Sequence, residues 1–149
     1  MREATGNALL TMIVAATIAI ILTFFVGTLS YSKSYKIKNY IIDQIEDNKG
    51  WDSSLEKDID EHLKDVGYNV RGNLNCNSSK NLPKNGWCKS IYQASSYNYC
   101  VYECLNGSYT YYTVLTFMKF EFPVISESIK INVYGSTKNI KSSTVNYFN

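Results

Sequence analysis

The cysteines are the residues of this chain whose number and spacing best suit a definite chemistry. All four, Cys76, Cys88, Cys100 and Cys104, fall in its C-terminal half. An even number of closely spaced cysteines in a small domain is typical of a disulfide framework. Zinc coordination and free thiols are the alternatives, but no two cysteines have the C-x-x-C spacing of a common zinc-binding pair. We expect two disulfides and no metal site.

The pairing of these cysteines depends on the local structure. Cys100 and Cys104 fall in a predicted strand, where a separation of four residues puts both side chains on one face, about 13 Å apart. That distance is too long for a bond between them, so each would bond to one of Cys76 and Cys88, in the loop before the strand. The sequence does not say which. If this segment is not a strand, Cys76–Cys88 with Cys100–Cys104 is the other pairing.

Few other side chains have a pattern that suits catalysis. His62, the only histidine, falls in a predicted helix without a nucleophile motif nearby, and we expect it at the helix surface. Glu103 and Glu121 are isolated carboxylates, and no glycine-rich phosphate loop occurs. The net charge is +2 and the lysines are scattered, so no basic patch indicates nucleic acid. The sequence therefore predicts no catalysis, cofactor, small-molecule substrate or nucleic-acid partner.

The N-terminal apolar segment must position everything that follows it. Residues 4–32 contain no charged side chain, and residues 8–29 would form a helix about 33 Å long, enough to cross a bilayer. A cleaved secretory signal has a shorter apolar part, and release by cleavage near Leu29 or Ser30 is the alternative. The expected organisation is a leader at 1–6, a transmembrane helix at 7–30, an amphipathic extension at 31–50 and an extracytoplasmic α+β domain at 51–149.

Helical periodicity continues beyond the apolar segment and returns after Gly50. Tyr31, Tyr35, Ile37, Ile41, Ile42 and Ile45 recur at helical spacing, which predicts one helix over residues 8–47. A second helix is predicted after a cap at Asp52 or Ser53, with its end at Gly67. Its apolar face would consist of Leu55, Ile59, Leu63 and Val66.

The pattern after Tyr68 changes to the two-residue period of strands. Residues 97–104 and 109–122 read as a hairpin around an Asn106-Gly107 turn, and a bend at Pro123 leads to a third strand over residues 128–134. A fourth strand is expected at 68–74. These strands would form an antiparallel sheet with one buried face, which the helix covers. The fold class is therefore α+β, with a long N-terminal helix leading into a small antiparallel sheet domain.

Two signals disagree on the orientation in the membrane. Arg2 precedes the apolar segment while Lys33, Lys36 and Lys38 follow it, and the positive-inside rule alone would keep the larger portion in the cytoplasm. Disulfides need an oxidising compartment. We give the cysteines more weight and expect a single-pass protein of the cell membrane, with a cytoplasmic N-terminus and an extracytoplasmic domain.

This arrangement resembles type IV pilins, and most of all the TadE-like pseudopilins of tight-adherence (Tad) pili. The stretch Gly6-Asn7-Ala8-Leu9-Leu10 is similar to the processing site of that family, and YYTVLTFMKFEFPVISESIKINVYGSTK resembles its closing strands. The family usually carries a glutamate where this chain has Thr11, which cannot pair with the amine of a neighbouring subunit. The resemblance therefore implies a minor, tip or assembly subunit of a pilus or a related secretion apparatus.

The resemblance also implies a mechanism. A leader would be removed between Gly6 and Asn7, and the partners would be the bilayer, other pilin-like subunits and a membrane assembly platform, giving a cell-surface filament. The residues that would pack between helices are Leu9, Leu10, Ile13, Val14, Ile20, Ile21, Phe24 and Phe25. The alternative is a membrane-anchored extracytoplasmic binding or adhesion domain that does not assemble.

Overall fold

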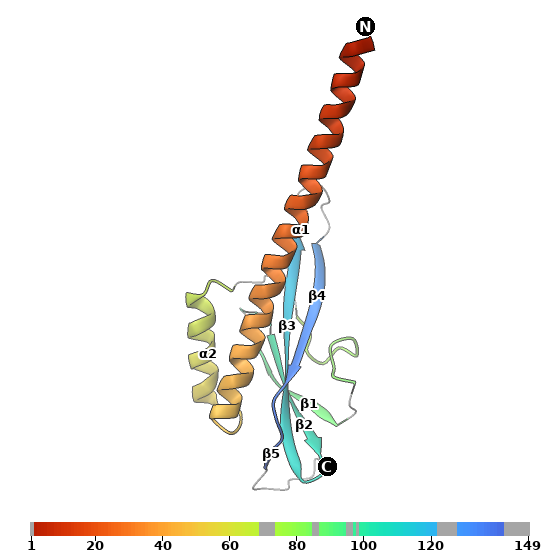
Figure 1. Cartoon of the computed structure of the whole chain (residues 1–149). Helices are drawn as coiled ribbons and strands as arrows, with labels where there is room; N and C mark the ends of the chain where they lie inside the picture. Colours follow the sequence, from red (N-terminus) through yellow and green to blue (C-terminus); the bar gives the residue numbers. More distant parts are fainter. Residues whose placement is uncertain are drawn as a thin grey trace.

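The computed structural model describes residues 2–68, 74–84, 87–94, 97, 99–121 and 128–141, and it has the α+β class expected (Figure 1). A long helix leads into a small domain with a second helix and an antiparallel sheet. The helices are α1 (Arg2–Asp47) and α2 (Ser53–Asp65). The strands are β1 (Cys88–Gln93), β2 (Tyr99–Asn106), β3 (Tyr109–Glu121), β4 (Ser128–Ser136) and β5 (Ile140–Lys141).

α1 is one unbroken helix of 46 residues, as its periodicity predicts, and it begins at Arg2. Its first half projects away from the domain, and its second half lies along the sheet (Figure 1). In the second half Ile37, Ile41 and Ile45 are 4%, 0% and 0% exposed. This spacing of three to four residues places them in one stripe, and the stripe holds α1 against the sheet.

The connection to α2 is fixed by the Asp52 carboxylate. Asp52 accepts hydrogen bonds from the backbone N–H of Leu55 (2.8 Å) and Ser54 (2.9 Å), which is the arrangement of an N-cap. The Leu55 bond first, then the Asn48 amide and Ser54, hold the pKa of Asp52 well below its usual range. Gly67 has a φ of +63° just after the helix, so the glycine end was predicted correctly.

Three of the four apolar residues expected to face the core from α2 do so. Leu55, Ile59 and Leu63 are buried, but Val66 is 41% exposed. Val66 was assigned to this face wrongly, because the helix ends at Asp65 and Val66 is its C-cap. Outside the helix the three-to-four-residue spacing no longer directs a side chain to the same face.

The sheet has the order β1-β2-β3-β4, with all neighbours antiparallel, and β5 pairs with the start of β3. In the β2–β3 hairpin Asn106 pairs with Tyr109, so Gly107 and Ser108 are the central residues of the turn. Gly107 has a φ of +60°, which suits the first central position of a two-residue hairpin loop. The predicted hairpin is confirmed, but its turn lies one residue later than expected.

The prediction of a fourth strand at 68–74 is wrong at its first and last residues. Tyr68 and Leu74 belong to no strand, and residues 69–73 lie outside the described part of the chain. Two strands were not predicted, the two-residue β5 and β1, which begins at Cys88, a residue expected in a loop. A bulge between Ser90 and Tyr92 interrupts its alternation, which hides the two-residue period from a sequence pattern. The bend at Pro123 and the end of the expected strand at Phe122 also lie outside the described residues.

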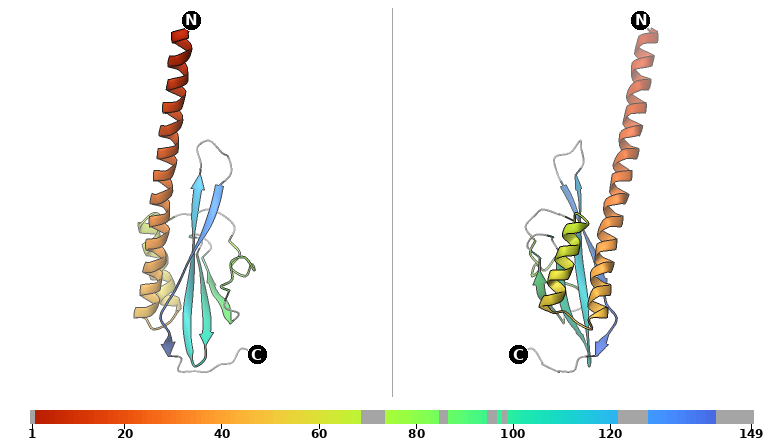
Figure 2. Two further views of the ribbon diagram at one scale, coloured as in Figure 1. Left: turned by 45° about the vertical axis from the view of Figure 1, so that its right-hand side comes forward. Right: turned by 90° about the vertical axis from the view of Figure 1, so that its left-hand side faces the viewer.

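Both faces of the sheet are buried, whereas the sequence predicted one. The helices cover one face, and the loop 74–84 covers the other (Figure 2). The helix side is a cluster of buried residues, namely Ile37, Ile41, Ile45, Leu55, Ile59, Leu63, Tyr68, Ala94, Tyr99, Val101 and Val114. The loop side is a second cluster, namely Cys76, Cys100, Tyr102, Cys104, Leu115 and Phe117.

The two disulfides reinforce the loop side. Cys76 in the loop bonds to Cys100 of β2, and Cys88 of β1 bonds to Cys104 of β2. Cys100 and Cys104 thus share one face and bond to separate partners, so the pairing of Cys76 with Cys88 is wrong. Cys88 was also expected in a loop, but it begins β1 opposite Cys104.

Removing either disulfide as a serine pair should cost about 3 kcal/mol, because the closed loops have sequence separations of 24 and 16. Denaturant unfolding of Cys76→Ser/Cys100→Ser and Cys88→Ser/Cys104→Ser measures this loss. Only Cys76→Ser/Cys100→Ser releases the loop 74–84. Only this variant should therefore be cut faster by trypsin after Lys80 and Lys84 under native conditions. Equal cleavage in both variants would contradict the stapling role of Cys76–Cys100.

Candidate functional site

Most of the exposed large apolar side chains of the described residues lie in the first half of α1. The eight residues expected to pack between helices are all between 48% and 75% exposed. At about 100° per residue they spread over roughly 160° of the helix circumference. This arc is centred roughly 120° from the buried stripe of Ile37, Ile41 and Ile45. A neighbouring helix can therefore reach most of this surface without displacing the domain.

The threonines of this segment satisfy their own hydroxyl groups. Thr11, Thr23 and Thr28 donate to the carbonyls of Asn7, Ala19 and Phe25 at 2.8 Å, and Thr17 donates to Ile13. Such bonds within the helix allow a hydroxyl to lie in lipid without a further partner. The helix is long and apolar enough to cross a membrane.

The expected processing residues lie within the first turns of α1. Gly6 and Asn7 are helical and exposed, and nothing lies within 4 Å of the position that a Gly6 Cβ would take. The Thr11 hydroxyl donates to the Asn7 carbonyl, so it already has a hydrogen-bond partner within the helix. The structure gives Gly6 no backbone feature that distinguishes it from its neighbours.

Tyr68 makes the joint between α1 and the sheet. Its hydroxyl donates to the Phe117 carbonyl (2.9 Å) and accepts from the Phe117 N–H (3.3 Å). The pairing of β2 with β3 reaches only from Tyr99 to Thr116, so the Tyr68 hydroxyl takes the place of the next backbone partner. Ser34 of α1 donates to the same carbonyl at 3.3 Å. Burial raises the pKa of Tyr68 to about 12.

Further contacts fix the helix to the domain along its length. A Cβ at Gly135 of β4 would lie 2.7 Å from side-chain atoms of both Lys38 and Ile42, so β4 approaches α1 as closely as a glycine allows. The Lys33 ammonium donates to the Gly67 carbonyl at 2.8 Å. Lower down, the Glu46 carboxylate accepts from the Lys138 N–H at 2.7 Å. These contacts fix the second half of α1, from Lys33 to Glu46, to the domain.

Several ionisable side chains at the core make hydrogen bonds or ring contacts that support the fold. The Asp60 carboxylate accepts from Tyr99 (2.9 Å) and Tyr92 (3.2 Å), and burial raises the pKa of both phenols. His62 is only partly buried and stacks on Tyr40, with ring centroids 3.9 Å apart. Among the described residues no cluster suits a metal ion.

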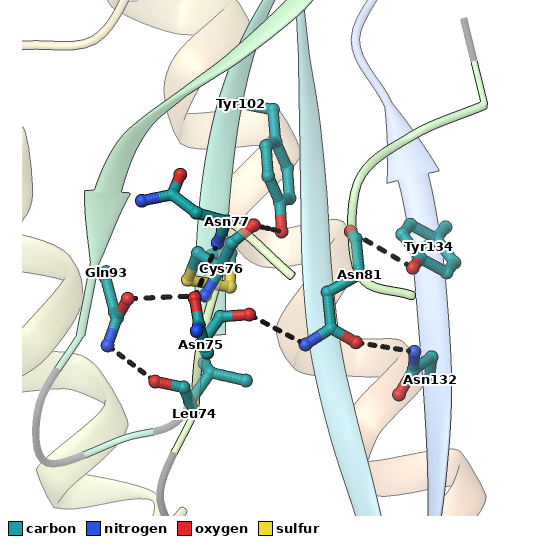
Figure 3. The surroundings of a disulfide bond; sticks show 10 residues. Leu74, Asn75, Cys76, Asn77, Asn81, Gln93, Tyr102, Asn132 and Tyr134 are labelled. Atoms are coloured by element: carbon teal, nitrogen blue, oxygen red, sulfur yellow. Dashed lines mark hydrogen bonds between the residues drawn. A yellow bond between two sulfur atoms is a disulfide. The ribbon is translucent and has the colours of Figure 1, made fainter. Parts of the chain in front are cut away.

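An asparagine-rich network anchors the loop 74–84 around the Cys76–Cys100 bond (Figure 3). The Asn81 amide donates to the Asn75 carbonyl (2.9 Å) and its oxygen accepts from Asn132 of β4 (3.2 Å). Gln93 of β1 donates to the Leu74 carbonyl. The network explains how a loop rich in polar residues covers an apolar cluster. Sequence reasoning missed it, because short polar side chains in a loop give no periodic signal.

Comparison with known proteins adds no family to this description. No family model, curated protein or solved structure matches the chain.

Replacing Tyr68 by phenylalanine should destabilise the domain by about 1–3 kcal/mol, because the Phe117 backbone loses a buried hydrogen-bond partner. Denaturant unfolding measures the loss. Tyr134→Phe is the matched control, because the Tyr134 hydroxyl also donates to backbone carbonyls, those of Lys80 and Asn81, but its side chain is 40% exposed and water can replace these bonds. A Tyr68→Phe midpoint no lower than that of Tyr134→Phe would contradict the role of Tyr68.

The domain should also lose stability in alkali. Because the folded pKa of Tyr68 lies near 12 and its ordinary value is 10.0, the fold favours the neutral phenol. This contribution is complete below pH 10 and is lost as the pH rises toward 12. Phenolate absorbance should therefore rise together with loss of helix signal above pH 10, and less steeply in Tyr68→Phe. Titration at ordinary pKa with the fold intact would contradict this.

Proposed function

We propose that this chain is a minor pilin-like subunit of a type IV or Tad-type pilus, or of a related secretion apparatus, and that it acts by helix-mediated assembly and not by catalysis. The observation that carries the proposal is the exposed apolar half of α1, which continues without a break into a disulfide-bonded domain. A simple tether needs no such rigid continuation.

The proposed mechanism starts with α1 in the cell membrane, its N-terminus in the cytoplasm and the domain outside. Removal of a leader between Gly6 and Asn7 would precede assembly. A membrane platform made of other proteins would then transfer α1 from lipid into a bundle of pilin-like helices. Van der Waals packing drives such contacts in lipid, since the tails are as apolar as leucine. The domain would follow as a rigid body, because Tyr68 and Ser34 fix it to the helix.

A membrane-anchored binding or adhesion domain that does not assemble is the second candidate. Trp87 and Tyr109 favour it, since they are 77% and 46% exposed. The Trp87 carbonyl accepts from Leu105, which places it near the β2–β3 turn, at the end of the sheet away from the free half of α1 (Figure 1). Exposed aromatic residues are common in contact surfaces.

Photo-crosslinking in the native host separates the two candidates. A benzophenone amino acid at Ile13 lies within the proposed assembly face, and one at Leu22 lies on the opposite side of α1 with similar exposure, 59% against 58%. Assembly predicts protein adducts from Ile13 and far fewer from Leu22. Adducts with lipid alone from both positions would contradict assembly and favour the anchored domain.

A further inference from the structure

The domain lies beside part of the apolar segment of α1, and not only beside its second half. Within residues 6–33 of α1 all side chains are exposed except Thr23, Gly27 and Ser30, which are half-buried. Their spacing of three to four residues continues the domain-facing stripe that runs through Ser34 and Ile41. Something in the domain therefore shields this side of α1 as far as Thr23.

The ends of β3 and β4 are the part of the domain that reaches this level. Ser34 contacts Phe117, and β3 continues four residues beyond it to Glu121, or about 13 Å. The same distance along α1 is about nine residues, which leads from Ser34 to near Phe25. All three ribbon views show these strand ends beside the apolar part of α1 (Figures 1 and 2).

The apolar part of α1 continues past the level of the strand ends. The uncharged helix from Ala4 to Leu22 extends about 28 Å, slightly less than a hydrocarbon core of about 30 Å. The apolar run itself continues to Leu29, so a bilayer centred on this run extends beside the strand ends. Tyr31 and Tyr35, which are 50% and 45% exposed and stack on each other, follow directly. Tyrosines are typical of the membrane–water interface.

We propose that the paired ends of β3 and β4 enter the lipid headgroup layer of the bilayer that α1 spans, so that the domain contacts the membrane at a second place. The proposal rests on the membrane placement of α1 in the proposed function, but not on assembly. The depth is limited, because Tyr68 satisfies the backbone of Phe117, and beyond it β3 pairs with β4 alone among the described strands. An open strand edge is tolerated in the headgroup layer, where water is present, but not in the hydrocarbon core.

The function of such a contact would be to fix the orientation of the domain. A single helix can rotate about its axis and tilt in the bilayer. A second contact beside α1 holds the domain-facing side toward one direction, which leaves the arc that includes Ile13 and Phe24 free for a neighbouring subunit.

Site-directed spin labelling in vesicles of phosphatidylcholine with phosphatidylglycerol tests the depth. Each variant adds one cysteine for labelling in the full chain. The sites are Ser128→Cys at the start of β4, Ser108→Cys at the opposite end of the sheet, and Ser32→Cys and Ala16→Cys on α1. Peptide mapping confirms that both native disulfides remain. The readout is the accessibility of each label to oxygen against a water-soluble nickel chelate.

The expected result is a label at 128 that lies at least as deep as the label at 32, with the label at 108 fully aqueous and the label at 16 in the hydrocarbon core. A label at 128 as accessible to nickel as the one at 108, with the label at 16 still immersed, would overturn the second contact and leave the membrane span intact. Loss of immersion at 16 would overturn both.

Discussion

The packing of the second half of α1 against the sheet is the contact on which the rest of the structure depends. Ile37, Ile41 and Ile45 join α2 and the sheet in one buried cluster. Without this stripe, α2 would keep only its own apolar face, and a single sheet would expose Tyr99 and Val101 to water. Because the same helix continues into the exposed apolar segment, any force on that segment reaches the domain through a rigid element.

The domain is small, and its sheet supports two separate buried clusters. Neither is large, since domains of this size bury a limited fraction of their surface. On the helix side, burial of isoleucines and tyrosines suffices. On the loop side, a polar loop is held over Tyr102 and Leu115 by the Cys76–Cys100 bond and the Asn81 contacts. The disulfides therefore lie on the side of the sheet with the smaller buried cluster, and their presence is consistent with an oxidising compartment.

Much of this fold could be predicted from the sequence, for identifiable reasons. The continuous helix, the Asp52 cap, the Gly67 end and three strands follow from periodicity and local hydrogen bonding. β1 was missed because its bulge breaks the alternation. The second buried face was missed although four successive residues of β2, from Tyr99 to Tyr102, are buried; such an unbroken apolar run signals a strand covered on both faces.

The candidate site was less predictable than the fold. The eight apolar residues of the proposed assembly face are exposed, but lipid and a neighbouring helix select the same residue types, so composition does not distinguish them. The contact between Tyr68 and Phe117 gave no sequence signal. The two residues are 49 positions apart, and only the tertiary fold brings the Tyr68 hydroxyl to the Phe117 backbone. The partial burial of Thr23 and Gly27 likewise depends on the position of the β3 and β4 ends in the fold, which the sequence pattern does not indicate.

The most direct test of the central claim, a pilin-like subunit, is the N-terminal residue of the membrane-bound protein in its native host. Mass spectrometry of the isolated chain provides it. The proposal predicts a mature chain that begins at Asn7, because leader removal after Gly6 precedes transfer of α1 into a bundle. A chain that begins at Met1 or Arg2 would contradict that route and leave α1 as a permanent anchor.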